Sequence, residues 1–348
     1  MGCCEVKEIN HLVVEDRIRS YIEANNIDSL KTLYKLITHK NKSFDINSIR
    51  YKIDDNFTVT PLGLTVLLGH GQMFSMIIQE MGGDFDLMES LFNNSQTTGL
   101  SIICLNNYLV LLQIYLPLFI NSKNQGAFPK PQIKITQTLN LDAKEELENI
   151  ISCTYTPMQI AVENGYISIV NILRSFAYNL PLIPSEIDID YIEENTGNNS
   201  ALISCKCNNY NMIKFLHYQC DADFKIINNF SENAINVLAI GSKENRAETF
   251  KCLEYLIEKV GVDFLYNYQE TLVMLQEPKA LSYFEEKLAS SGIVVNKEEL
   301  EAEAIIRPVK RTACVKFDTG NRFTFTKMFP ELIRNSREGF SNVLDVDN

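Results

Sequence analysis

Short blocks of apolar residues recur along the chain, each about one helix long and separated by polar or glycine-containing turns. Near the start, apolar residues lie three and four positions apart on both sides of Asn25-Asn26, which predicts a helical hairpin over residues 15–38. Near the other end, residues 280–288 followed by Gly292 predict a last helix that stops at a glycine. The pattern therefore predicts an all-α chain of short helix pairs.

One motif repeats along these blocks. Its two full copies are Thr60-Pro61-Leu62 with Gly69-His70 and Gly82-Gly83-Asp84, and Thr156-Pro157-Met158 with Gly165-Tyr166 and the apolar run 169–173. Partial copies begin at Thr98, Ser200, Asn233 and Glu270, so that consecutive copies are spaced 33 to 58 residues apart. Spacings of this kind indicate a repeat of about 33 residues enlarged by insertions.

These units resemble the ankyrin repeat, whose consensus joins T-P-L-H-x-A, a Gly-His turn and a terminal G-A-D. The resemblance covers residues 15–290 and implies an ankyrin-repeat solenoid of stacked helix-turn-helix units with a small non-repeat C-terminal tail. Threonine before proline is expected to cap the first helix of a unit, and Gly165 to form the turn between helices. Gly63 and Gln159 replace the consensus histidine, and Asn209 replaces a turn glycine.

Four segments are expected along the chain. They are an acylation-like segment at 1–14, a helical cap at 15–55, the repeat array at 56–295 with an insertion at 121–150, and a basic tail at 296–348. In the insertion, residues 121–130 have a loop-like composition and residues 141–151 the pattern of an acidic helix. Such an insertion either is a tolerated surface excursion or decorates a binding surface.

The tail concentrates positive charge. Residues 307–337 contain eight Lys/Arg and two acids, in a chain whose net charge is −12. The first five basic residues are Arg307, Lys310, Arg311, Lys316 and Arg322. Alternating residues on both sides of Asp318-Thr319-Gly320-Asn321 predict a β-hairpin. The tail is expected either to fold onto the acidic array or to contact an acidic protein surface or anionic lipid.

Composition restricts the class of protein. Hydrophobic residues form 45% and charged residues 22% of the chain, which is ordinary globular usage. The net charge of −12 disfavours nucleic acid as the main partner. Nine scattered cysteines predict free thiols in a reducing, intracellular compartment, and charged residues near the start disfavour a secretory signal.

One stretch has the length of a membrane span. Residues 100–120 are mostly apolar and long enough to cross a bilayer. Polar residues interrupt the stretch at Asn106, Asn107 and Gln113, and Pro117 lies near its end. Because unpaired polar groups are costly in hydrocarbon, a buried helix pair is favoured over a span.

The N-terminus resembles a lipidation signal. Gly2 follows the initiator methionine as in N-myristoylated proteins, and Cys3 and Cys4 are candidate palmitoylation sites. Val6 departs from the motif, which prefers serine or threonine at that position. The segment is therefore either an acyl anchor or an unmodified terminus.

Candidate chemistry is sparse. Cys205, Cys207, His217 and Cys220 could in principle bind zinc, but their spacing matches no standard site, so buried thiols are favoured. The sequence has no phosphate-binding, dinucleotide-binding, zinc-protease or nucleophile-elbow motif, so neither catalysis nor a cofactor is expected.

The resemblance implies a protein-binding function. The tips of the loops between repeats are expected near Phe57, Tyr155, Asn198-Asn199 and Phe230. The three aromatic side chains either anchor a partner or pack on the adjacent turn. Two functions are predicted: a scaffold or adaptor tethered to the cytoplasmic face of a membrane by acyl chains, or a structural part of a cytoskeletal, for example ciliary, assembly. An acidic cytoskeletal surface would suit the basic tail.

Overall fold

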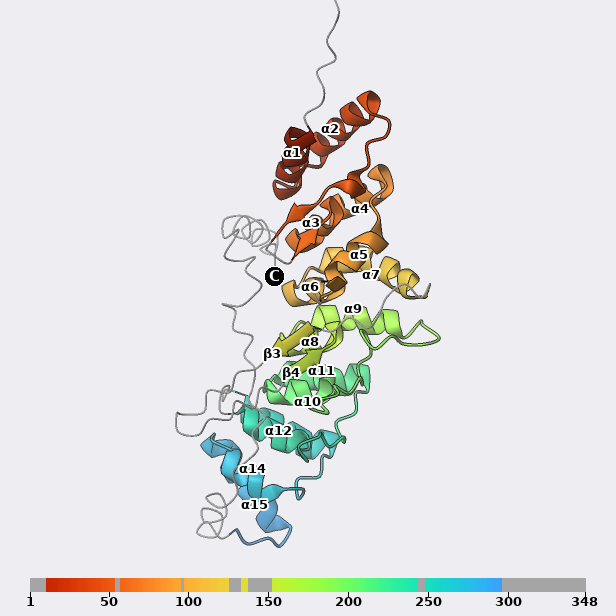
Figure 1. The fold of residues 1–348 in the computed structure, drawn as a ribbon. Coiled ribbons are helices and arrows are strands. Elements are labelled where there is room, and N and C mark those ends of the chain that lie inside the picture. The colour runs from red at the N-terminus through yellow and green to blue at the C-terminus, as the bar shows by residue number, and fades with distance from the viewer. Residues whose placement is uncertain are drawn as a thin grey trace, which may run out of the picture. The chain divides into compact units, whose positions relative to one another are not determined.

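The computed structural model describes residues 11–53, 57–94, 97–124, 133–136, 152–242 and 248–295. The chain divides into two compact units, of which the first holds the described residues up to 124 and the second those from 133 onward (Figure 1). Each unit is built of short helices arranged in pairs, and a tight turn joins the two helices of a pair wherever the structure describes the connection. The helix-pair architecture predicted from the sequence is confirmed.

The first unit stacks three helix pairs in its described residues. Its elements are α1 (His11–Glu23), α2 (Ile27–Lys40), η1 (Ile46–Ser48), β1 (Tyr51–Lys52), β2 (Thr58–Val59), α3 (Pro61–Leu68), α4 (Gly71–Met81), α5 (Phe85–Asn94), α6 (Gly99–Asn106) and α7 (Leu109–Asn124). The inner helix α3 contacts α1 and α6, while the outer helix α4 contacts α2 and α7. The hairpin expected at residues 15–38 is present as α1 and α2. Residues 121–124, expected as loop, extend α7.

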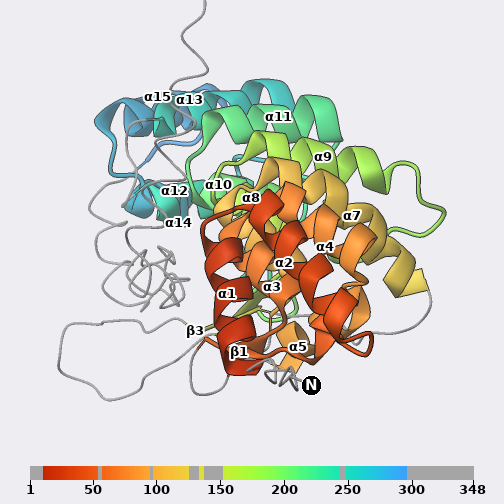
Figure 2. The same cartoon turned by 90° about the horizontal axis from the view of Figure 1, so that it is seen from above.

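The second unit stacks four helix pairs in its described residues. Its elements are β3 (Ile133–Thr136), β4 (Ser152–Tyr155), α8 (Pro157–Glu163), α9 (Ile167–Ala177), α10 (Ser200–Lys206), α11 (Tyr210–Cys220), α12 (Ala234–Gly241), α13 (Thr249–Tyr255), η2 (Leu256–Val260), α14 (Tyr268–Met274) and α15 (Pro278–Ser290). Figure 2 shows α9, α11, α13 and α15 in one row and α8, α10, α12 and α14 in another. Within each row, consecutive helices contact each other. Strands β3 and β4 pair antiparallel, with Ile133 opposite Tyr155.

A polar side chain caps the start of each inner helix from α3 to α12. The side chains of Thr60, Thr98, Thr156, Asn199 and Asn233 accept hydrogen bonds from backbone N–H groups in the first turn of their helices. These bonds satisfy N–H groups that have no partner inside the helix. The capping role predicted for the two Thr-Pro pairs is confirmed, and asparagine replaces threonine in the later repeats.

In the pairs from α3 and α4 to α10 and α11, a left-handed residue forms the turn between the two helices. Gly69, Asn107, Gly165 and Asn208 adopt φ values of 75°, 59°, 73° and 51°. The prediction that Asn209 takes this turn position is wrong by one residue. Asn209 is instead the N-cap of α11, where its side chain accepts a hydrogen bond from the Met212 N–H at 3.0 Å. Asparagine tolerates the left-handed region better than other non-glycine residues.

Side-chain amides replace the consensus histidine in two repeats. The Gln159 Nε2 donates to the backbone oxygens of Tyr191 and Asn198, at 3.0 and 3.3 Å. In the corresponding position of α12, the Asn236 Nδ2 donates to the Thr271 Oγ1 at 2.8 Å. Each amide thereby connects the start of one inner helix to the next repeat. This polar connection persists without a histidine.

Glutamates connect the outer helices of the second unit. Glu248, just before α13, accepts a hydrogen bond from the Tyr210 N–H of α11 through its Oε2, at 3.3 Å. In the next repeat, Glu277 accepts one from the Phe250 N–H of α13 through its Oε2, at 2.7 Å. Each carboxylate lies at a helix N-terminus, where negative charge is favourable. The outer row is thus held by hydrogen bonds as well as by apolar contact.

The membrane-span alternative for residues 100–120 is not what the structure shows. The stretch forms α6 and α7, with the left-handed Asn107 in the turn between them, and Leu100, Leu111 and Leu116 are buried. Within the described residues, no helix has the length and apolarity needed to cross a membrane. The buried helix pair favoured from the sequence is confirmed.

Candidate interaction surface

Three loops of the second unit lead into consecutive inner helices. We call them the finger loops: residues 188–198 before α10, 221–232 before α12 and 261–267 before α14 (Figure 1). The second finger loop begins directly after the outer helix α11, and the third directly after the turn η2 that extends α13. The first follows an inserted loop at residues 178–187, in which Tyr178 and Leu182 are 85% and 84% exposed. Neighbouring finger loops lie side by side because their inner helices stack.

Asparagine side chains connect one finger loop to the next. The Asn228 Nδ2 donates to the Asn198 Oδ1 of the preceding loop at 3.0 Å, and its Oδ1 accepts from the backbone N–H groups of Phe230 and Glu232. The Asn229 backbone N–H donates to the Thr196 oxygen at 2.9 Å. These hydrogen bonds cross-link neighbouring finger loops, and such a network favours one conformation of the loops.

Aspartates and helix caps extend the network. The Asp223 backbone N–H donates to the Asp190 Oδ1 at 3.0 Å, which joins the first two finger loops. The Asp223 backbone oxygen accepts from the Asn199 Nδ2 at 2.8 Å, and the Asp263 oxygen accepts from the Asn233 Nδ2 at 2.7 Å. The two N-cap asparagines thus hold the following finger loop as well as their own helix.

Each finger loop exposes one large aliphatic side chain. These are Ile192, Ile227 and Leu265, which are 53%, 52% and 43% exposed. Phe230 is half-buried beside them in the second loop. Single exposed aliphatic residues are common on protein surfaces, but here three successive hydrogen-bonded loops carry one each. We call Ile192, Ile227 and Leu265 the finger row.

Carboxylates surround the finger row. The exposed acidic residues of the finger loops are Asp190, Glu194, Asp221, Asp223 and Asp263. Lys225 is their one exposed basic residue. The pKa of Asp190 is raised, mainly because its carboxyl is partly buried. The hydrogen bond from the Asp223 N–H opposes this shift, and the charges of Asp188, Asp223 and Asp221 add to it. This surface favours a positively charged partner.

The aromatic anchors predicted from the sequence require correction. Phe57 and Tyr155 are 3% and 1% exposed. The Phe57 ring packs against Phe92, with ring centroids 5.7 Å apart, and Tyr155 lies in β4, next to α8. Both side chains belong to the core, since Phe57 packs against α5 and Tyr155 lies next to α8. Neither can anchor a partner in this conformation.

The remaining predicted contact residues divide into two kinds. Asn198 and Asn199 are each 1% exposed, and both serve the internal network, so their assignment as partner contacts is also corrected. Phe230 stays partly accessible. The sequence predicts aromatic residues at the loop tips and does not predict the finger row. Each of the three directly follows an apolar or aromatic residue (Tyr191, Ile226 and Phe264), so no local sequence signal distinguishes it.

The possible zinc ligands are not brought together. Cys205 is buried within α10, Cys207 caps the end of that helix, and Cys220 ends α11. The His217 Nδ1 lies 3.0 Å from the Tyr255 hydroxyl oxygen. Burial raises the pKa of Cys205 well above that of a free thiol. In the part of the chain that the structure describes, no three His, Cys, Asp or Glu side chains form a metal site.

Several predictions lie outside the described residues. They concern lipidation at Gly2, Cys3 and Cys4, the basic tail contacts Arg307, Lys310, Arg311, Lys316 and Arg322, the acidic helix at 141–151 and the hairpin around residues 318–321. They stay predictions.

Comparison with known proteins finds matches among solved structures and none by sequence. Neither a protein-family model nor a curated protein matches the sequence. Similar solved structures include the ankyrin repeat domain of Bcl-3, a member of the IkappaB family, with 16% identity, a TM-score of 0.46 and coverage of 76% of this chain and 96% of that chain. The human ASB11 ankyrin repeat domain has 15% identity and a TM-score of 0.47, and the match covers 77% of this chain and 95% of that chain. The structure of the Bdellovibrio bacteriovorus endopeptidase Bd0816 in complex with immunity protein Bd3460 matches with 16% identity and a TM-score of 0.38. That match covers 68% of this chain and 95% of that chain.

The chain has the ankyrin-repeat fold predicted from its sequence. This assignment rests on features of the chain itself: capped inner helices, left-handed turns within the pairs, rows of inner and outer helices, and finger loops between successive pairs. An array of this kind is a helical repeat in which each pair contacts its neighbours.

Proposed function

We propose that this protein is a non-catalytic protein-interaction module whose finger row binds a partner segment with basic and apolar side chains. The observation that carries the proposal is the finger row itself, three exposed aliphatic side chains held in hydrogen-bonded loops. Loops that are ordered before binding lose little conformational entropy when a partner arrives. The row can therefore use its apolar contacts for affinity.

The acidic residues around the finger row define the chemistry of the partner. Five exposed carboxylates against one exposed lysine attract basic side chains and repel acidic ones. Charges at the rim of an interface mainly speed association and select partners, whereas buried apolar contacts at its centre supply most of the affinity. A partner with alternating Lys/Arg and Leu/Ile side chains matches both properties.

Selection from a display library of random short peptides on the full chain tests this proposal. We expect the enriched peptides to combine basic and aliphatic residues, and to bind at least about tenfold more weakly to a variant with Ile192→Ser, Ile227→Ser and Leu265→Ser. Added salt should reduce the rate of association. The matched control carries Tyr178→Ser and Leu182→Ser, which remove exposed apolar side chains outside the finger loops. Equal binding to the finger-row variant and the wild type would refute the proposal.

The same proposal includes attachment to the cytoplasmic face of a membrane through Gly2, Cys3 and Cys4. The sequence motif supports this, with its departure at Val6. One acyl chain gives only marginal binding, so a myristoyl group needs a palmitoyl group beside it for stable attachment. The tether would concentrate the module near membrane-bound partners inside the cell.

A structural role in a cytoskeletal or ciliary assembly is the second candidate function. The basic tail supports it, because eight Lys/Arg and two acids within residues 307–337 suit an acidic lattice. In that case the helix pairs and the tail would both contact the assembly, and the lipid motif would be incidental.

Fractionation of cells that express the wild type or Gly2→Ala separates the two roles. An acylated adaptor is expected in the detergent-soluble membrane fraction, and Gly2→Ala should move most of it to the soluble fraction, because myristoylation requires the glycine. A cytoskeletal component should stay in the detergent-insoluble pellet in both forms and leave it with high salt. Gly2→Ala that partitions like the wild type would exclude the tether.

A further inference from the structure

The first helix pair carries positive charge in an acidic chain. Residues 11–53 contain eight Lys/Arg and five Asp/Glu, a net charge of +3, whereas the net charge of the whole chain is −12. The lysines gather around α2, because the sixteen residues between Asp28 and Asp45 hold four lysines and no acid. Salt screens exposed charges that lie more than about 10 Å apart at 0.1 M, so attraction is decided locally. This helix pair therefore attracts anions although the chain is acidic.

Three of these four lysines have no partner that accounts for them. The Lys31 Nζ lies 2.5 Å from the Glu80 Oε1 of α4, which is an ion pair within the first unit. The other three, Lys35, Lys40 and Lys42, are exposed and form no ion pair in the part of the chain that the structure describes. Lys40 lies in the last turn of α2, where the helix dipole favours positive charge. Lys35 and Lys42 lie outside that turn, so the dipole does not explain all three.

Exposed aliphatic side chains accompany these lysines. Leu12 and Val13, in the first turn of α1, are 72% and 47% exposed, and Leu36 of α2 is 58% exposed. A tight turn joins α1 to α2 and the two helices pack against each other, so the start of α1 lies beside the end of α2 (Figure 2). The lysines and the aliphatic residues thus share one end of the helix pair. We call Leu12, Val13, Lys35, Leu36, Lys40 and Lys42 the terminal patch.

We propose that the terminal patch binds the surface of a bilayer that contains anionic phospholipids. Lysines near such a surface are attracted by its negative potential, while aliphatic side chains enter the boundary between headgroups and acyl chains. α1 begins nine residues after Gly2. Because one acyl chain gives only marginal binding, a basic patch can supply the second contact that stable attachment needs. That last role rests on the proposed acylation of Gly2, whereas lipid binding by the patch does not.

An acidic protein surface would also attract the lysines, but two features favour lipid. Leu12 and Leu36 gain from entering a bilayer interface without needing a shaped pocket on the partner. A specific protein interface buries about 800 Å² and 20 to 30 residues on each side, far more than the terminal patch provides. A small patch that mixes lysine with aliphatic residues is therefore suited to a membrane surface.

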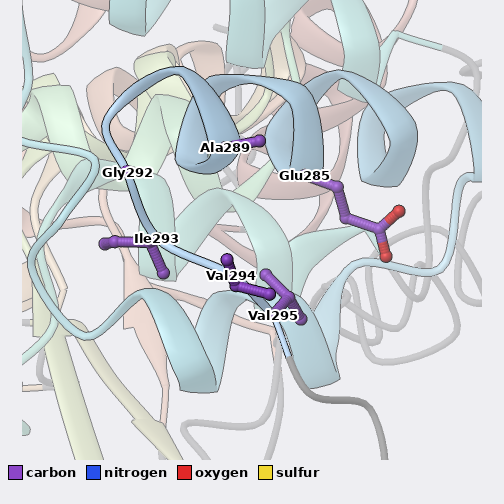
Figure 3. A pocket seen from close by; sticks show the side chains of 6 residues that line it. All are labelled: Glu285, Ala289, Gly292, Ile293, Val294 and Val295. Atoms are coloured by element: carbon purple, nitrogen blue, oxygen red, sulfur yellow. The ribbon is translucent and has the colours of Figure 1, made fainter.

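Apolar exposure alone would not select anionic lipid. A pocket beside α15 in the second unit is lined by Glu285, Ala289, Gly292, Ile293, Val294 and Val295. Figure 3 shows the three consecutive aliphatic residues of this lining with the Glu285 carboxylate beside them. A carboxylate repels anionic headgroups. The terminal patch differs from this apolar surface because its charged residues are lysines.

Co-sedimentation with vesicles tests the proposal on the full chain produced without acylation. At about 0.1 M salt we expect binding to vesicles of phosphatidylcholine with about 30% phosphatidylserine, and much weaker binding to phosphatidylcholine alone. The combined substitutions Lys35→Gln, Lys40→Gln and Lys42→Gln should weaken binding to the anionic vesicles at least about tenfold, because each lysine near the surface contributes. Absence of binding to the anionic vesicles would overturn the proposal.

The matched control removes the same charge from the second unit. It carries Lys214→Gln, Lys225→Gln and Lys259→Gln, all at exposed lysines, and should bind the anionic vesicles like the wild type. An equal loss in the two variants would show that net charge and not the terminal patch governs binding, and would refute the proposal. Since the chain in this test carries no acyl group, the patch and the proposed tether at Gly2 can fail separately.

A second variant tests the aliphatic part of the patch. Leu12→Ser with Leu36→Ser should weaken binding to the anionic vesicles about tenfold, because both side chains lose their contact with the bilayer interface. The melting temperature should not change, since both side chains are exposed. A DNA duplex serves as an anion without an apolar interior. If the duplex binds as tightly as the vesicles and the two serines have no effect on either, the patch is a general polyanion site and the proposal is wrong.

Discussion

Replacing Gly241 with alanine is expected to lower the free energy of unfolding of the second unit by about 3 kcal/mol, near the upper end for overpacked cores. Gly241 is the last residue of α12 and is buried against the end of α10. A Cβ at this position would lie 1.9 Å from the Lys206 backbone oxygen and 2.8 Å from its carbonyl carbon. Because both atoms belong to the backbone, no side-chain rotation can relieve the clash. The two helices would have to move apart.

Denaturant unfolding followed by circular dichroism measures this effect. Gly261→Ala is the matched control, because Gly261 has a φ of 73° but its added Cβ meets no atom within 4 Å. The control should cost about 1 kcal/mol, from the left-handed backbone alone. Separation of α10 from α12 should also reduce the cooperativity of unfolding, since repeats are stabilised by contacts with their neighbours. A cost for Gly241→Ala no greater than that of the control would contradict the close approach of the two helices.

Glu163→Gln is expected to stabilise the second unit at alkaline pH by about 2 to 3 kcal/mol. Glu163 ends α8, and although its stem is partly exposed, both carboxylate oxygens are buried and make no hydrogen bond within the described residues. Burial raises the pKa of this carboxyl to about 7, and the charge of Lys206 lowers it in part. Ionised Glu163 is therefore a cost to the folded state that glutamine removes.

The pH dependence follows from the sign of the shift. Between about pH 4.5 and 7, the folded protein holds the Glu163 proton more tightly than the unfolded chain does, so wild-type stability should fall as pH rises through this window. Above pH 7 the free energy of unfolding of Glu163→Gln should exceed that of the wild type by the full amount, and below pH 4.5 the two should be equal. Urea unfolding at a series of pH values measures this difference in the free energy of unfolding. Glu194→Gln, at an exposed glutamate, is the control. A difference between Glu163→Gln and wild type that does not change with pH would show that the carboxylate is not buried as described.

Amide side chains perform much of the polar work in this protein. Asparagine caps helices at Asn199, Asn209 and Asn233, and it connects finger loops at Asn228. An amide both donates and accepts, so one side chain can cap its own helix and also reach the next repeat. Asn233 does both, since its oxygen accepts from the Ile235 and Asn236 N–H groups and its nitrogen donates to Asp263. Where the repeats lack the consensus histidine, Gln159 and Asn236 connect their helices to the next repeat.

The helix pairs could be predicted because their signals are local. Thr60-Pro61 and Thr156-Pro157 start inner helices through a hydroxyl cap and a proline that needs no hydrogen bond, and both effects act within four residues. Gly165 ends a helix because of its own backbone freedom. Such signals survive even where the repeat is irregular. They determined, from the sequence alone, the all-α class and the helix pairs.

Exposure could not be predicted in the same way. Phe57 and Tyr155 look like loop tips in the sequence but are buried, whereas Ile192, Ile227 and Leu265 are exposed. Whether a loop side chain faces water depends on the neighbouring loop, which lies about 33 residues away in the sequence. The same holds for Glu163, whose raised pKa comes from burial. The sequence by itself thus determined which segments become helices and how they pair, through capping and turn preferences, and only the tertiary structure decided which side chains form the interaction surface, because stacking of the repeats sets their burial.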